Sequence, residues 1–208
     1  KKRNGVEGML PEHIGYENGV LGGVISALNV ICSKGDHVLL HSPTYIGFTN
    51  SLGNSGYKIV HSPLVKDEEG VYRMDFEDME KQIVEKRIPM MIFCSPHNPT
   101  GRVWERWEIE KVVELCDKYN VFLFSDEIWA DFMTDPASKH IPTQSVSDRA
   151  KQICLAAYAP SKTFNLAGLI GSYTICYNPV INARIKRQGE STHYNNANVL
   201  SLAACTGA

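Results

Sequence analysis

Short runs of apolar residues alternate along this chain with longer segments in which apolar residues recur every third or fourth position. Apolar runs of about four to eight residues, bounded by polar, proline or glycine residues, are typical of strands, several of them buried on both faces. Helical periodicity covers Val20 to Cys32, Asp75 to Arg87 and Trp104 to Tyr119. The predicted strands are His37 to His41, Tyr57 to His61, Met90 to Ser95, Val121 to Ser125, Ile153 to Tyr158 and Ile170 to Tyr177.

This alternation of strands and helices predicts an α/β fold with a largely parallel sheet. Ligands of such sheets bind outside the carboxyl ends of the strands, so the residues that follow each strand matter most. Tyr45, Asn98, Asp126 and Lys162 each come shortly after a different predicted strand. An aromatic ring, an amide, a carboxylate and an amine are therefore expected at one edge of the sheet.

Composition and charge narrow the classes of function. The 208 residues suffice for one sizeable domain, and a net charge of -2 does not favour a nucleic-acid or anionic-membrane surface. The apolar runs are too short to cross a bilayer, and no signal-peptide pattern is visible. The six cysteines form no C-x-x-C pair, and the seven histidines have no metal-ligand spacing. We expect a reducing, cytoplasmic setting and no metal catalysis.

Three motifs carry a family resemblance. They are Ser95 to Gly101 (Ser-Pro-His-Asn-Pro-Thr-Gly), Ser125 to Trp129 (Ser-Asp-Glu-Ile-Trp) and Ala159 to Gly168 (Ala-Pro-Ser-Lys-Thr-Phe-Asn-Leu-Ala-Gly). In this order they resemble the large domain of the class I/II aminotransferase family, the fold-type I pyridoxal-5'-phosphate (PLP) enzymes. The segment Tyr158 to Leu169 is similar to the branch of cystathionine β-lyases and related carbon–sulfur lyases. The resemblance implies a three-layer αβα fold and PLP as the cofactor.

The resemblance also implies roles for three polar residues. Lys162 would hold PLP as a Schiff base, which requires that its amine be deprotonated or trapped as an imine. Asp126 would pair with the pyridine nitrogen and make the ring an electron sink. Asn98 would donate a hydrogen bond to the phenolic oxygen. The ordinary alternatives are a surface lysine, an aspartate that caps a helix, and an asparagine–proline turn.

Further residues would enclose the cofactor. Tyr45 would stack on one face of the ring and Ile128 would pack on the other, although core packing is the simple alternative for both. The backbone amides of Val20 and Leu21, at the start of a helix, would bind the phosphate together with the Ser161 hydroxyl.

Three positions depart from the aspartate-type aminotransferases. Trp129 stands beside the expected cofactor, where many members have a tyrosine that reaches the phenolic oxygen. Ala159 replaces a phosphate-binding serine, and Phe164 to Gly171 lacks the arginine that many members use for the phosphate. These differences weaken the transfer of an aspartate-type mechanism, whereas Asn165 and Leu166 suit the lyase-like branch.

The implied reaction begins with an amino acid that displaces Lys162, whose free amine then removes the α-proton as general base. Loss of a thiolate from the β-carbon leads to pyruvate and ammonia, with cystathionine or a related cysteine conjugate as the expected substrate. Transamination shares every step up to the carbanion and is the alternative. A non-catalytic regulator with a PLP fold is the third hypothesis, against which the intact Lys162, Asp126 and Asn98 argue.

The resemblance also predicts which part of a longer protein residues 1–208 represent. Family members carry an N-terminal segment and a smaller C-terminal domain, which supplies the arginine that binds the substrate carboxylate. We therefore expect residues 1–208 to be a fragment that comprises the large PLP-binding domain. The resemblance further implies a homodimer with shared active sites.

Overall fold

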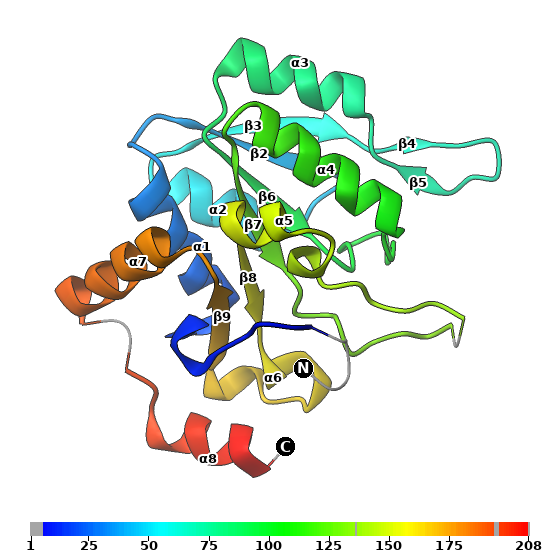
Figure 1. Cartoon of the computed structure of the whole chain (residues 1–208). Coiled ribbons are helices and arrows are strands. Elements are labelled where there is room, and N and C mark those ends of the chain that lie inside the picture. The colour runs from blue at the N-terminus through cyan, green and yellow to red at the C-terminus, as the bar shows by residue number, and fades with distance from the viewer. Residues whose placement is uncertain (1–5, 136, 194–195, 208) are drawn as a thin grey trace.

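A seven-stranded mixed sheet forms the centre of the protein (Figure 1). The computed structural model describes residues 6–135, 137–193 and 196–207. The strand order across the sheet is β1-β9-β8-β7-β6-β2-β3. The strands are β1 (Ile14–Glu17), β2 (His37–Ser42), β3 (Lys58–Pro63), β6 (Met90–Cys94), β7 (Phe122–Asp126), β8 (Cys154–Tyr158) and β9 (Ser172–Cys176).

The direction of the strands changes at one side of the sheet. From β8 to β3 all neighbouring strands are parallel, which confirms the predicted mostly parallel sheet. β9 runs antiparallel to β8, and β1 runs antiparallel to β9. The sequence analysis missed β1, because Ile-Gly-Tyr-Glu has neither an apolar run nor a clear alternation. After two reversals β1 points in the same direction as β8, so its carboxyl end lies at the same edge of the sheet.

Helices cover both faces of the sheet and confirm the three-layer αβα architecture (Figure 1). One apolar cluster contains Val24, Phe48 and Ile185, and the other contains Met79 and Val112. The first face is covered by α1 (Gly19–Ile31), α2 (Ile46–Asn54) and α7 (Pro179–Thr192), and the second by α3 (Phe76–Lys86), α4 (Arg106–Lys118) and α5 (Asp148–Ile153).

The central strand β6 explains why its sequence is an unbroken apolar run. Met90, Ile92 and Cys94 belong to the cluster on one face, whereas Met91 and Phe93 belong to the cluster on the other. All five are at most 5% exposed. A strand covered on both faces has no solvent side on which polar residues would alternate.

The predicted helices agree with α1, α3 and α4 to within one or two residues at each end. Asp75, the predicted start of its helix, is the N-cap of α3 and accepts a hydrogen bond from the Asp78 amide at 3.0 Å. The sequence analysis did not predict α2, whose nine residues include two glycines and two asparagines that disfavour helix. Tertiary burial of Phe48 and Leu52 stabilises α2 instead.

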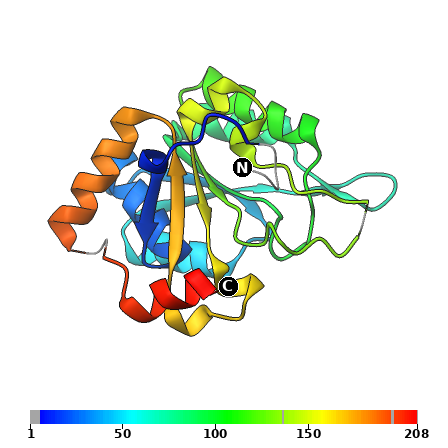
Figure 2. The same cartoon turned by 60° about the horizontal axis from the view of Figure 1, so that its bottom comes forward.

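Short elements gather at the carboxyl edge of the parallel strands. Figure 2 shows α6 (Pro160–Thr163) and α8 (Val199–Gly207) at this edge. Ser201 and Asn198 donate hydrogen bonds to the Leu169 carbonyl in η3 (Ala167–Leu169), which ties the start of α8 to the segment after α6. The remaining elements are η1 (Pro11–His13), η2 (Thr143–Ser145) and a hairpin of β4 (Val65–Lys66) and β5 (Tyr72–Arg73).

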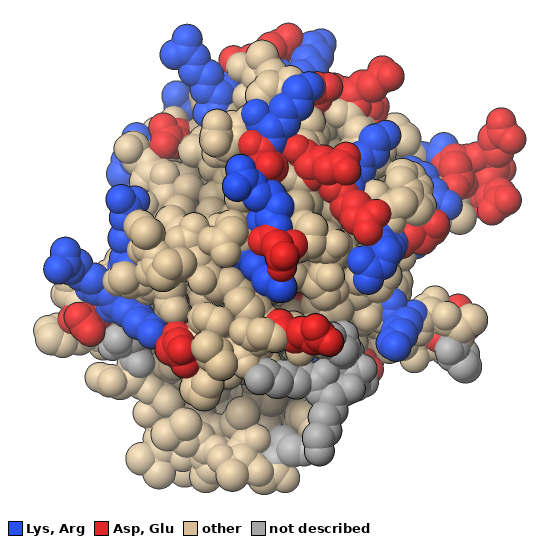
Figure 3. Space-filling model, in the orientation of Figure 1, with Lys and Arg blue, Asp and Glu red and all other residues tan. Residues whose placement is uncertain are grey.

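The surface in Figure 3 mixes acidic and basic side chains over α3 and α4. Around α8 charges are sparse, and Val199, Leu200 and Leu202 expose 79%, 69% and 55% of their area. Among the described residues, no helix combines the length and apolarity that a membrane span requires.

Candidate active site

A cavity of about 270 Å³ lies at the carboxyl ends of the parallel strands. Its wall brings together all nine residues that the sequence predicts to contact the cofactor, although their roles stay predictions. Residues from six segments contribute, which explains why no single motif defines the site. The lining residues are Asn18, Gly19, Val20, Leu21, Tyr45, Cys94, Asn98, Asp126, Ile128, Trp129, Ser161, Lys162, Ala167, Ile170 and Gly171.

Asp126 is the buried carboxyl group at the base of this cavity. It is the last residue of β7 and is 5% exposed. Burial raises the pKa of Asp126 from 3.8 to about 7, and the Glu127 charge adds to this, whereas the Ile128 amide, 3.0 Å from Oδ1, and the Lys162 charge lower it. A cationic N–H donor in the cavity would therefore stabilise the ionised carboxylate.

Glu127 anchors the end of β7 on the side that faces away from the cavity. It is 1% exposed, and its carboxylate accepts hydrogen bonds from the Ser125 hydroxyl at 3.0 Å and the Thr143 amide at 3.0 Å. The Tyr158 hydroxyl donates at 2.5 Å, and His140 Nε2 lies 2.7 Å away. Four partners satisfy this buried carboxylate, which holds Asp126 on a rigid support.

The Lys162 side chain lies at the cavity wall and is exposed, although Lys162 follows a buried strand. The reason is that α6 is a single turn that projects beyond the end of β8. The Lys162 amine lies 5.5 Å from the centre of the Trp129 ring, and its charge acts on Asp126. The amine therefore faces the predicted partners although water reaches it.

The Tyr45 ring is placed by a glycine two residues further on. Tyr45 is the N-cap of α2, and its ring packs edge-on against Phe48 with centroids 5.5 Å apart. A Cβ atom at Gly47 would overlap the Tyr45 ring. Position 47 must therefore lack a side chain for Tyr45 to keep this place in the cavity wall. Ile128 is partly buried and packs against the core cluster of α1, so core packing contributes to its position as well.

The start of α1 offers backbone amides to the cavity. Gly19 begins the helix with φ of +78°, a conformation that favours glycine. The Asn18 side chain does not cap the helix and instead accepts a hydrogen bond from the Tyr16 hydroxyl at 2.7 Å. Val20 and Leu21 follow in the first turn, where amides and the helix dipole favour an anion.

A second buried carboxyl group lies directly before this helix. Glu17 is 4% exposed and accepts a hydrogen bond from the Ser26 hydroxyl at 2.9 Å. Burial raises the pKa of Glu17 from 4.5 to about 7, and the Ser26 bond opposes this only in part. The sequence analysis did not single out Glu17, because β1 itself was not predicted.

We expect Glu17→Gln to change the pH dependence of stability. Between pH 4.5 and about 7 the folded state of the cofactor-free protein holds the Glu17 proton and the unfolded state does not, so stability falls as pH rises. Glutamine removes this loss, and the variant should gain about 2–3 kcal/mol relative to the parent protein between pH 5 and pH 8. Urea unfolding of both proteins at pH 5 and at pH 8 measures this difference in the free energy of unfolding. Glu85→Gln, on an exposed position of α3, should show no such gain.

The family model for aminotransferase class I and II matches residues 11–206. The chain belongs to the aminotransferase class I and II family. Cystathionine beta-lyase PatB of Bacillus subtilis (strain 168) is 39% identical over 165 residues, which are 79% of this chain and 42% of PatB. Glutamate-pyruvate aminotransferase AlaA of Escherichia coli (strain K12) is 26% identical over 86% of this chain and 43% of its own.

Solved structures of this family share the fold. Cystalysin from Treponema denticola, whose crystal structure contains a pyridoxal 5'-phosphate cofactor, superposes with a TM-score of 0.89 at 33% identity, over 95% of this chain and 50% of cystalysin. The chain thus has the fold of the large domain of fold-type I PLP enzymes. It spans about half the length of the family members it matches.

Proposed function

We propose that this protein is a PLP-dependent carbon–sulfur β-lyase that acts on cystathionine or a related cysteine conjugate and releases a thiol, pyruvate and ammonia. The observation that carries the proposal is the convergence of Lys162, Asp126 and Asn98 on one cavity at the carboxyl ends of the strands. Similarity to PatB, at 39% identity over 79% of this chain, supports the lyase.

The residues of the cavity fit PLP by their chemistry. A cationic partner would lower the raised pKa of the buried Asp126 carboxyl group and favour its ionised form, and the protonated pyridine nitrogen of PLP is such a partner. The amides of Val20 and Leu21 at the start of α1 suit the phosphate, with the Ser161 hydroxyl on the same wall. The exposed amine of Lys162 is free to condense with the cofactor aldehyde.

The remaining wall residues would orient the ring. Tyr45 would lie against one face, and Ile128, supported by the core, would lie against the other. The Asn98 amide would donate to the phenolic oxygen. Trp129 would cover the Lys162 amine, because its ring already lies 5.5 Å from Nζ and a cation near an aromatic face is stabilised.

PLP, when bound, supplies the electron sink that stabilises negative charge at the substrate Cα. The Asp126 carboxylate would keep the pyridine nitrogen protonated, and Glu127 would hold that carboxylate in place through the backbone at the end of β7. The Lys162 amine would remove the proton from the substrate Cα. The C–S bond would then break, and its electron pair would leave with the thiolate.

We further propose that residues 1–208 are the large domain of a homodimeric enzyme. Coverage of about half of PatB and cystalysin supports the assignment to one domain, because both proteins extend beyond the matched part, and the homodimer is proposed from the family resemblance. A reducing, cytoplasmic setting is also proposed, because four of the six cysteines are buried and all six are unpaired.

The lyase proposal predicts that the protein loaded with PLP converts cystathionine to pyruvate, with one thiol and one ammonia released per pyruvate. A coupled lactate dehydrogenase assay and a thiol reagent measure the products. Exchange of the amino group with alanine or glutamate, without pyruvate from cystathionine, would instead identify an aminotransferase. Failure to take up PLP at all would favour the non-catalytic regulator.

A further inference from the structure

The loop that carries Asn98 is held by hydrogen bonds among residues 97–102. The His97 amide donates to the Arg102 carbonyl at 2.9 Å, and the Gly101 amide donates to the His97 carbonyl at 2.7 Å. The Thr100 hydroxyl lies 2.9 Å from His97 Nδ1 and accepts from the Arg102 amide at 3.3 Å. The position of Asn98 therefore depends on where Arg102 is held.

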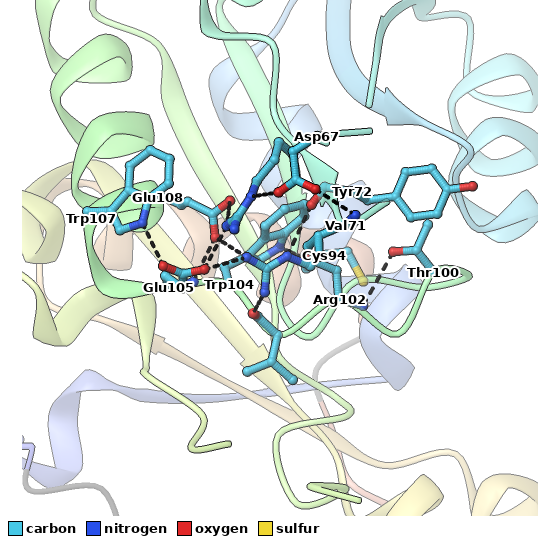
Figure 4. A network of polar contacts seen from close by, with 12 residues as sticks. Asp67, Val71, Tyr72, Cys94, Thr100, Arg102, Trp104, Glu105, Trp107 and Glu108 are labelled. Carbon is cyan, nitrogen blue, oxygen red and sulfur yellow. Dashed lines mark hydrogen bonds and ion pairs between the residues drawn. The ribbon is translucent and has the colours of Figure 1, made fainter. Parts of the chain in front are cut away.

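The Arg102 side chain is fixed from several directions, as Figure 4 shows. Its Nε donates to the Tyr72 carbonyl in β5 at 3.1 Å. Its Nη2 lies 3.0 Å from Glu105 Oε1 and 2.8 Å from Glu108 Oε2, and Nη1 donates to the Val103 carbonyl. The side chain is only 14% exposed, so water competes little for these contacts.

Glu108 is the centre of this network and is fully buried. Its carboxylate also receives Arg73 Nη1 at 3.3 Å and the Glu105 amide at 2.8 Å, which caps the start of α4 (Figure 4). Arg73 also pairs with Asp67 at 2.9 Å, at the start of the loop that connects β4 to β5. Burial of a carboxylate with two arginines costs desolvation free energy, which is recovered only while their contact geometry is kept. Glu108 therefore fixes the relative positions of Arg73 and Arg102.

A second anchor holds the other end of the loop. The Trp104 indole donates to the Cys94 carbonyl at 2.8 Å, and its ring lies under the Arg102 guanidinium at 5.5 Å. Trp104 is 2% exposed and packs against His97 with ring centres 5.7 Å apart. The segment from Cys94 to Trp104 is thereby pinned on both sides of Asn98.

We propose that Arg102 is a positioning residue for Asn98: through Glu108 it holds the loop so that the Asn98 amide points into the cofactor cavity. The proposal rests on the proposed function, because it assigns Arg102 an effect on PLP through Asn98. It adds to that function a link from the cofactor site to the β4–β5 hairpin, more than twenty residues earlier in the chain.

The first test needs no cofactor. Hydrogen exchange of the peptide that spans residues 95–103, followed by mass spectrometry, should be about tenfold faster in Arg102→Met than in the parent protein. Arg106→Met is the matched control, because Arg106 is an exposed arginine at the start of α4, four residues after Arg102, and its ion pair among the described residues is with Glu110 at 3.5 Å. Unchanged exchange in a folded Arg102→Met protein would overturn the proposal, whatever the protein binds.

The second test is a double-mutant cycle on PLP affinity, measured by fluorescence titration. Arg102→Met should weaken PLP binding about tenfold, the scale of one hydrogen bond to a charged or strongly polar group. In the Asn98→Ala background the same change should weaken binding less than twofold, because the contact that Arg102 supports is already gone. Equal losses in both backgrounds would show that Arg102 acts generally on the fold and would refute the positioning role.

Folding of Arg102→Met is checked by circular dichroism, because the change leaves Glu108 with one arginine. If that variant does not fold, Arg102→Lys, which keeps the charge but cannot reach Tyr72 and Glu108 at once, takes its place with an intermediate effect expected in both tests. A parent protein that takes up no PLP would refute the proposed function, while the exchange experiment would still decide on Arg102.

Discussion

Lys162→Ala is expected to abolish covalent attachment of PLP and to lower turnover by roughly 10²–10⁴-fold or more, since the variant loses the amine that binds the cofactor and the base that removes the α-proton. Borohydride treatment followed by intact mass should add the reduced cofactor to the parent protein and not to the variant. Fold and stability should change little, because the Lys162 side chain is exposed and its amine lies 5.5 Å from the centre of the Trp129 ring.

Lys139→Ala is a suitable control for this experiment, because it changes a lysine that is not part of the cavity wall. It should keep both the mass increase and the activity. Ordinary turnover in Lys162→Ala would contradict the central assignment, and so would borohydride fixation of PLP at a different lysine.

Asp126→Asn is expected to have opposite effects on activity and on stability. Asparagine cannot hold the pyridine nitrogen protonated, so turnover should fall by at least about 10²-fold, the scale of losing one preorganised electrostatic contact. The cofactor-free variant should become more stable than the parent protein as pH rises from 5 to 8, by about 3 kcal/mol. The folded parent binds the Asp126 proton up to about pH 7 and the unfolded chain only up to 3.8, so its stability is lost as pH rises through this window.

Urea unfolding of the cofactor-free proteins at pH 5 and pH 8 measures the stability difference. Asp148→Asn provides the control, because its carboxylate is 96% exposed and burial plays little part there. A variant that turned over normally would exclude the electron-sink role of Asp126. A stability difference that did not depend on pH would exclude the raised pKa.

The sequence predicted the parts of the site that follow from strand position. Asn98, Asp126 and Lys162 come after unbroken apolar runs, and parallel strands deliver their carboxyl ends to one edge. The cavity contains all three. The exposure of Lys162 was not foreseen, because the length of α6 and its projection beyond β8 are not encoded in any periodic pattern.

Features that depend on contacts between distant residues could not be predicted. Glu127 pairs with Tyr158, 31 residues later, and Glu108 with Arg73, 35 residues earlier. No local pattern distinguishes such buried carboxylates from solvent-exposed ones. The clearance between Gly47 and the Tyr45 ring is equally invisible in a sequence, because it depends on one side-chain rotamer.

The double reversal of strand direction at β9 has a consequence for how the cofactor would be released. The phosphate end would rest on α1, which begins where β1 ends, whereas the ring would rest on β6, β7 and the turn after β8. β1 is joined to the sheet only through β9, so loss of these two outer strands would remove the strand that leads into α1 and would leave that helix held by its packing in the apolar cluster on one face of the sheet. Retention of PLP under mild denaturation would then report on the integrity of this edge of the sheet.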